Sequence, residues 1–159
     1  AHALSLYFAG SSVLDLGCGR GEYVQFFTGH GIDACGVDGN PHTQRWLPSA
    51  GVADLSAPQI LPVHDWVLTL EVGEHVPTAY ENVFIQNLHR HNRKGIILSW
   101  AVPGQKGWGH VNCKTNDEVA EKVCLLGYVR DLQTQRQLRS SASLRWFKNT
   151  LMVFPRAKL

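Results

Sequence analysis

Several features that would restrict the class of function are missing from this sequence. None of its four cysteines forms a C-x-x-C pair. Only His110-x-x-Cys113 has the spacing of a metal-ligand pair, and no second pair accompanies it, so we expect free thiols and no metal site. Free thiols favour an intracellular, cytoplasmic location. No apolar run approaches the roughly 20 residues of a membrane-spanning helix.

The start of the chain also lacks two features. It shows no basic-then-apolar segment of the kind found in secretory signal peptides. The first residue is Ala1 rather than Met, and the length of 159 residues suits one domain. We therefore expect a single domain over residues 1–159 that is a trimmed part of a longer chain.

Net charge is low but unevenly distributed along the chain. Residues 1–89 carry two basic and nine acidic residues, whereas residues 90–159 carry thirteen basic and four acidic ones. Basic side chains between residues 130 and 148 offer contacts to an anionic partner such as RNA: Arg136, Arg139, Arg145 and Lys148. The alternative interpretation is a solvated surface of arginine and lysine stems.

Strand-like apolar segments alternate with helix-like segments, which is typical of an α/β sheet. We predict seven strands at residues 12–16, 33–38, 51–55, 65–70, 95–100, 128–132 and within 149–156. We predict helices at residues 20–29, 40–47, 78–91 and 115–126, the last with a Thr115–Glu118 capping box, and a helix or loop at 133–142. Two prolines between Ser56 and His64 favour a turn there rather than a crossover helix.

The stretch VLDLGCGRGEY (residues 13–23) places Gly17, Gly19 and Gly21 directly after the first predicted strand. This G-x-G-x-G spacing fits neither the dinucleotide fingerprint nor the phosphate loop. Glu22, at the start of the next helix, would also repel a pyrophosphate. A cofactor with a zwitterionic amino-acid tail and no phosphate fits better, with its ammonium near Asp15.

Acidic residues also follow the second and third predicted strands. Asp38 ends the second strand, where an open α/β sheet places a carboxylate that accepts hydrogen bonds from both ribose hydroxyls. Asp54 follows the third strand, within reach of an adenine amine. Each acid taken alone is also explained as a turn or cap residue. Three acids in order at adjacent strand ends favour a binding site for an adenosyl group.

These motifs resemble those of the class I S-adenosylmethionine-dependent methyltransferases. The resemblance rests on VLDLGCGRGEY, GVDGNP, ADLS, LTLEVGEHVP and KGIILSW, and the fourth of these is common in the generic and ubiquinone-biosynthesis-like branch. It implies a Rossmann-like, mostly parallel seven-stranded sheet of order 3-2-1-4-5-7-6, with strand 7 antiparallel and helices on both faces. It also implies S-adenosylmethionine as cofactor and S-adenosylhomocysteine as product. The cofactor-binding residues would be Asp15, Gly17, Gly19, Gly21, Asp38, Gly39, Asp54, Leu55, Leu70 and Glu71.

Candidate groups for the methyl acceptor follow the fourth and fifth predicted strands. The loop at residues 101–114 is rich in glycine and carries a tryptophan and a histidine, which is unusual for inert surface. Imidazole accepts a proton near neutral pH, so His110 is the predicted general base. The alternative is that the tryptophans pack in the core and the histidines hold loops. The predicted substrate contacts are Trp108, Trp100 and Gln105, and the predicted catalytic groups are His110, His75 and Glu71.

The sequence therefore predicts a methyltransferase acting on oxygen or nitrogen of a small or medium-sized acceptor. It has no (D/N)-P-P-(Y/F) motif after the fourth predicted strand and no evident Lys-Asp-Lys-Glu set, which disfavours methylation of base amines and ribose hydroxyls. Two alternatives stay open: a cofactor-binding interaction module without turnover, and an RNA methyltransferase that uses the basic segment 130–148. Placement of Trp108 and His110 against the methyl donor would favour catalysis.

Overall fold

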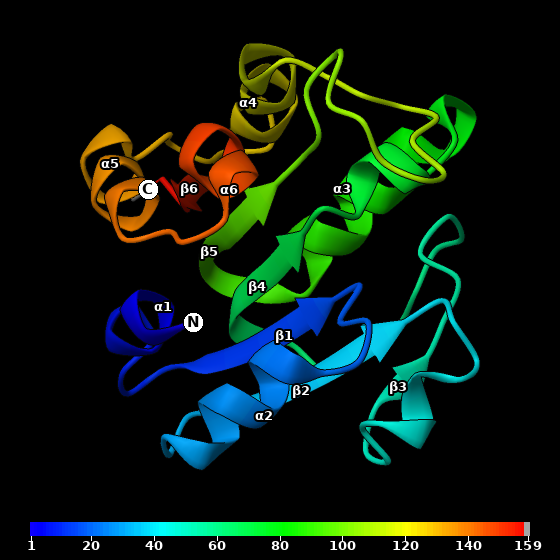
Figure 1. The fold of residues 1–159 in the computed structure, drawn as a ribbon, viewed down its shortest axis with the longest axis vertical. Helices are drawn as coiled ribbons and strands as arrows, with labels where there is room; N and C mark the ends of the chain where they lie inside the picture. The colour runs from blue at the N-terminus through cyan, green and yellow to red at the C-terminus, as the bar shows by residue number, and fades with distance from the viewer. Residues whose placement is uncertain (158–159) are drawn as a thin grey trace.

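A six-stranded sheet forms the centre of the computed structural model, which describes residues 1–157 (Figure 1). The strand order is β3-β2-β1-β4-β5-β6. All neighbouring strands are parallel except β5 and β6, which are antiparallel. This confirms the predicted Rossmann-like α/β fold. The strands are β1 (Ser12–Leu16), β2 (Asp33–Asp38), β3 (Gly51–Val52), β4 (His64–Leu70), β5 (Asn92–Ser99) and β6 (Met152–Pro155).

Helices cover both faces of the sheet (Figure 1). One face packs against α3 (Glu81–Arg90) and α4 (Asn116–Cys124). The other packs against α1 (His2–Tyr7), α2 (Glu22–Gly29) and α5 (Leu132–Ser140), and α6 (Arg145–Thr150) contacts α5. None of the helices in the described part of the chain is long and apolar enough to span a membrane.

Successive side chains of the central strands lie on opposite faces of the sheet and pack into two separate hydrophobic cores. Val67 on β4 belongs to the α3 and α4 side, whereas Leu68 belongs to the α1 and α2 side. Ile96 and Ile97 on β5 divide in the same way. All four are fully buried, and burial of such a side chain contributes about 1.5–3 kcal/mol. The two-sided burial explains why these strands read as continuous apolar runs.

The sixth predicted strand is reduced to a single bridge. Tyr128 pairs antiparallel with Arg156, and the Asp131 N–H donates to the Val153 carbonyl at 2.9 Å. This segment lies along the outer edge of β6, where the predicted order places it, but α5 begins immediately afterwards. Asp131 caps that helix by accepting hydrogen bonds from its first-turn N–H groups, which ends the pairing.

Three other local predictions have different outcomes. Residues 40–47 contain only a 3-10 turn, Thr43–Arg45, because the Asn40 side chain accepts the His42 N–H at 2.9 Å in a local turn and caps no α-helix. The capping box of Thr115 and Glu118 is confirmed at the start of α4. No helix joins β3 to β4 in the described structure, as the prolines predicted.

Candidate active site

The glycine turn after β1 has a backbone that other residues rarely adopt. Gly17, Gly19 and Gly21 have φ angles of 87°, 55° and 76°. A Cβ on Gly17 would overlap Val72, and one on Gly21 would overlap Leu47. A Cβ on Gly19 would meet nothing within 4 Å. Gly17 and Gly21 therefore allow the turn to pack closely, and Gly19 leaves space beside it.

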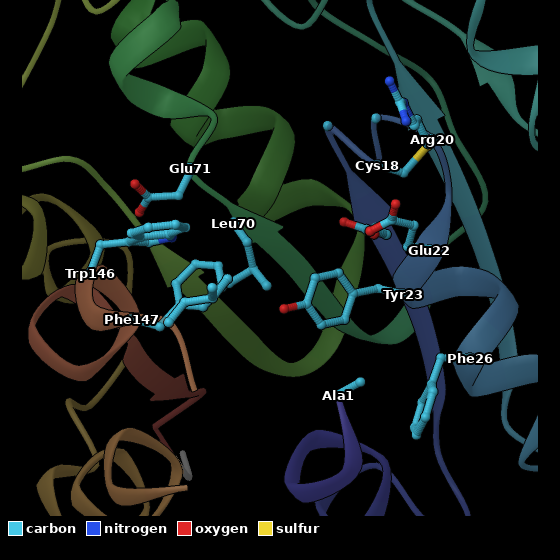
Figure 2. Close-up of a pocket in the computed structure, with 14 residues that line it drawn as sticks. Ala1, Cys18, Arg20, Glu22, Tyr23, Phe26, Leu70, Glu71, Trp146 and Phe147 are labelled. Carbon is cyan, nitrogen blue, oxygen red and sulfur yellow. The ribbon is translucent and has the colours of Figure 1, made fainter. Parts of the chain in front are cut away.

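Two cavities open at the carboxyl ends of β1 and β4, where ligands bind in sheets of this kind. Their volumes are about 570 Å³ and about 650 Å³. The linings of both include Gly17, Gly19, Leu70 and Glu71, so the two cavities meet at these residues. Figure 2 shows the larger cavity.

The smaller cavity is lined by four of the predicted cofactor residues that follow β2 and β3: Asp38, Gly39, Asp54 and Leu55. The Asp38 carboxylate accepts the N–H of Gly19 at 2.7 Å and that of Asn40 at 2.8 Å. It is thus fixed beside the glycine turn. Hydrogen bonds from the hydroxyl and N–H of Ser56 hold the pKa of Asp54 below its usual value. Both carboxylates keep lone pairs for a ligand.

Asp15 lies on β1 and lines the larger cavity, although its side chain is almost fully buried. Burial raises the pKa of Asp15 from 3.8 to about 7, and the negative charge of Asp38 adds to the shift. A buried carboxylate without a cation is costly when ionised. A cationic group in the cavity would therefore favour the charged form of Asp15.

Glu71 occupies the junction of the two cavities directly after β4. Its φ of 55° is the single positive value among non-glycine residues in the described part of the chain, a strain of about 1–3 kcal/mol. Its N–H donates to Ser99 Oγ at 2.9 Å. The carboxylate accepts Gln105 Nε2 at 2.5 Å and Thr150 Oγ1 at 3.4 Å. Gln105 therefore orients Glu71, and it lines neither cavity.

An aromatic wall that the sequence did not predict borders the larger cavity. Trp146 and Phe147 from α6 lie opposite Tyr23 and Phe26 from α2 (Figure 2). The rings of Trp146 and Phe147 are 5.9 Å apart, edge to face. The only sequence signal was this aromatic pair within the basic segment 130–148.

Neither predicted tryptophan contact lines either of these two cavities. Trp100 is 1% exposed, packs against Phe84 in the core, and donates its indole N–H to the Asn112 carbonyl at 2.6 Å. Trp108 is 97% exposed on the loop that follows β5. The aromatic wall of the larger cavity therefore comes from α6 and not from this loop.

The two predicted catalytic histidines lie side by side beyond Glu71. Their ring centroids are 5.1 Å apart, and His75 lines the smaller cavity whereas His110 lines neither. Between them and the core lies Glu74, which is completely buried, with its carboxylate 4.0 Å from His110 Nε2. Burial raises the pKa of Glu74 to about 7, and the nearby charge of Glu71 contributes.

Part of the predicted basic surface is occupied within the protein. Arg139 donates its Nε–H to the Leu151 carbonyl at 2.7 Å, and Arg130 pairs with Asp117 at 2.8 Å. The other basic side chains of the segment are exposed: Arg136, Arg145 and Lys148. The segment 130–148 thus offers an anionic partner fewer free cations than the sequence implies.

Comparison with known proteins agrees with this fold. A family model described as a methyltransferase domain matches residues 2–147. The solved magnesium protoporphyrin IX methyltransferase of Synechocystis with bound S-adenosylhomocysteine is similar at 18% identity, a TM-score of 0.72, and coverage of 98% of this chain and 81% of that one. The sugar N-methyltransferase KedS8 of Streptoalloteichus is similar at 16% identity, a TM-score of 0.74, and coverage of 99% and 85%.

A third similar structure is the N-methyltransferase NodS of Bradyrhizobium japonicum with bound S-adenosylhomocysteine, at 16% identity, a TM-score of 0.71, and coverage of 99% and 85%. No curated protein sequence gives a significant match. At these identities the solved structures establish the fold, and the family model establishes membership. The chain belongs to the methyltransferase-domain family and has the fold of the class I S-adenosylmethionine-dependent methyltransferases.

Proposed function

We propose that this chain transfers a methyl group from S-adenosylmethionine to an oxygen or nitrogen of a small or medium-sized acceptor. The observation that carries the proposal is the pair of cavities that meet at Gly17, Gly19, Leu70 and Glu71. One cavity suits an adenosine, and the other has room for the methionine tail and an acceptor. Their junction is then the place of the sulfonium group.

Polar groups of the two cavities suit the parts of this cofactor in order. Asp38 would accept both ribose hydroxyls, a charge-assisted pairing worth about 1.5–3 kcal/mol. Asp54 would accept the adenine amine, and Leu55 would contact the ring. Asp15, at the bottom of the larger cavity, would pair with the methionine ammonium. This pairing would supply the cation that its buried carboxylate lacks.

The acceptor would lie against the aromatic wall of the larger cavity. Trp146 and Phe147 offer flat apolar surface, and Glu71 lies beside them with a carboxylate that can orient a polar acceptor (Figure 2). Methyl transfer from a sulfonium is an in-line displacement, so alignment supplies most of the acceleration. A solved structural neighbour carries bound 1,6-didemethyltoxoflavin together with S-adenosylhomocysteine, which supports a small-molecule acceptor for this fold.

The cofactor-binding module without turnover stays the main alternative. The loop with Trp108 and His110 lines neither cavity, so it gives catalysis no direct support. Support for turnover comes instead from the larger cavity, whose volume of about 650 Å³ is within the range of small-molecule sites. The strained backbone of Glu71 at the junction of the two cavities also supports turnover, because such strain concentrates at functional sites.

Calorimetric titration with S-adenosylhomocysteine tests cofactor binding, with one site per chain expected. Absence of binding at millimolar concentration would refute the proposal at its first step. A screen with methyl-labelled S-adenosylmethionine then tests turnover, with hydroxyl-bearing and amine-bearing small molecules in one panel and RNA in another. Product-analogue binding without label transfer to any panel would favour the interaction module. Transfer to RNA, falling steeply with salt, would favour the RNA enzyme.

A further inference from the structure

We propose that Glu74, His75 and His110 bind one divalent transition-metal ion beside the cofactor cavity. One potential ligand atom from each residue lies within 4.8 Å of the other two. The sequence predicted no metal site, and its one suggestive spacing, His110-x-x-Cys113, paired His110 with a different residue. The cluster escapes sequence patterns because the fold brings His110 back to Glu74 and His75 from the loop after β5.

The carboxylate of Glu74 has no partner that satisfies it. The residue is 0% exposed, and neither of its carboxylate oxygens makes a hydrogen bond of full geometry, although the backbone N–H groups of Glu74 and Ala101 lie near them. Among the described residues no lysine or arginine pairs with it, and His110 Nε2 at 4.0 Å is the nearest basic group. The carboxylate of the neighbouring Glu71 adds negative charge. A cation bound at Glu74 would supply the compensation that a buried carboxylate requires.

Backbone hydrogen bonds leave one ring nitrogen of each imidazole free to bind a metal. His75 Nδ1 lies 3.1 Å from the Gly109 carbonyl, and His110 Nδ1 lies 3.1 Å from the Gln105 carbonyl. A carbonyl only accepts hydrogen bonds, so each ring carries its proton on Nδ1 and keeps a lone pair on Nε2. Metal-binding histidines in proteins are held by the same arrangement.

Backbone contacts hold the three side chains together. The Glu74 carbonyl accepts the N–H groups of Val111 and Asn112 at 2.9 and 3.0 Å, which fastens the loop next to the 3-10 turn Gly73–His75. A Cβ at Gly107 would overlap the ring of His110, so the absence of a side chain there lets the loop close over that ring. The cluster is thus built by the fold and not by freely rotating surface side chains.

The dimensions and donor set suit a first-row transition metal. Three atoms within 4.8 Å of one another lie at most about 2.8 Å from a common centre. Zinc-ligand distances are about 2.0–2.2 Å, so binding requires shifts of under about 1 Å. Two imidazoles and one carboxylate form the donor set of zinc and non-haem iron sites, whereas magnesium and calcium prefer oxygen ligands. Three protein ligands leave at least one position open.

The location of the site gives the ion a role that rests on the proposed methyl transfer. His75 lines the smaller cavity, and Glu71 lies at the junction. A metal lowers the pKa of a bound hydroxyl, so the open position favours an acceptor that is methylated on oxygen. The hydroxyl would release its proton to water, its oxygen would form the new bond to the methyl carbon, and the breaking C–S bond would leave its electron pair on sulfur.

Titration of the metal-free protein with Co²⁺, followed by visible absorption, tests the site, and calorimetry with Zn²⁺ provides the stoichiometry. We expect one ion per chain for the wild type. Glu74→Gln and His110→Asn should each weaken binding at least 100-fold. The matched control His42→Asn removes an exposed imidazole outside the cluster and should bind as the wild type does. Thermal unfolding of each variant identifies any that fail to fold.

Wild-type protein that binds neither Co²⁺ nor Zn²⁺ stoichiometrically would overturn the inference. Binding that persists in both folded cluster variants would do the same, because the ion would then lie elsewhere. A parallel titration with S-adenosylhomocysteine separates the two proposals. Metal binding without binding of this product analogue would refute the proposed function alone, and the reverse result would refute the metal site alone.

Discussion

Substitution of Asp15 by Asn should stabilise the protein while weakening its affinity for the cofactor. Asparagine has nearly the shape of the protonated acid and cannot ionise. The Asp15 side chain is almost completely buried, and burial raises its pKa to about 7. Ionisation of the buried Asp15 therefore lowers the free energy of unfolding of the wild type at neutral and basic pH, and the variant does not lose this stability. The variant also lacks the charge that we propose pairs with the methionine ammonium.

The magnitude follows from the two pKa values of Asp15. In the unfolded chain the carboxyl group ionises near 3.8 and in the fold near 7, a difference equivalent to about 4 kcal/mol. A carboxyl pKa raised by folding leaves stability intact at low pH, and that stability is lost as pH rises from about 4 to about 7. Asp15→Asn should therefore gain about 4 kcal/mol at pH 8 and only about 1.5 kcal/mol at pH 5.

Urea unfolding of both proteins at these two pH values measures this difference. Asp33→Asn, which makes the same chemical change at an exposed position on β2, should alter the free energy of unfolding by less than about 0.5 kcal/mol. A variant no more stable than wild type at pH 8, or a gain that does not grow between pH 5 and pH 8, would show that Asp15 is not forced to ionise in a costly site.

Four further outcomes test other parts of the structure. Asp38→Ala should weaken S-adenosylhomocysteine binding about 10- to 150-fold in calorimetry, from the loss of about 1.5–3 kcal/mol of charge-assisted hydrogen bonding; unchanged affinity would refute the ribose assignment. His110→Ala should lower turnover at least tenfold with cofactor affinity within twofold, and undiminished turnover would remove His110 from the chemistry. Trp146→Ala should raise the acceptor KM, whereas Trp108→Ala, at an exposed position outside both cavities, should not. Equal effects of these two variants on KM would contradict the aromatic wall.

Elements with strong local signals were predictable from the sequence. The strands at 12–16 and 33–38 have the predicted bounds, because each is a short run bordered by turn residues, Gly10 and Gly17 for the first and Gly31 and Gly39 for the second. The helix α6 was missed because its six residues are too few to show a helical repeat of apolar positions, and it is stabilised by packing against α5. The third strand is shorter than predicted, ending at Val52, because it lies at the sheet edge and pairs with β2 alone.

The residues of the candidate site also fall into a part that the sequence predicts and a part that it does not. Nine of the predicted cofactor residues line the two cavities, because they follow strand ends that the sheet brings to one edge. Gly21 does not line either cavity and serves the start of α2 instead. The aromatic wall and the Glu74 cluster were not predictable, since each depends on a segment that returns to the sheet from elsewhere in the chain. Trp108 and His110 line neither cavity, and the Glu74 carbonyl holds their loop next to the 3-10 turn Gly73–His75.

The left-handed backbone of Glu71 has a consequence for the natural variation of this position. Glycine would adopt the same φ of 55° without strain, so folding stability alone would select glycine there. A population of homologues kept only for a stable scaffold should accumulate glycine or asparagine at this position. Homologues that retain the acid keep a less stable backbone at this position. Retention of the acid therefore distinguishes homologues selected for activity from homologues selected for stability alone.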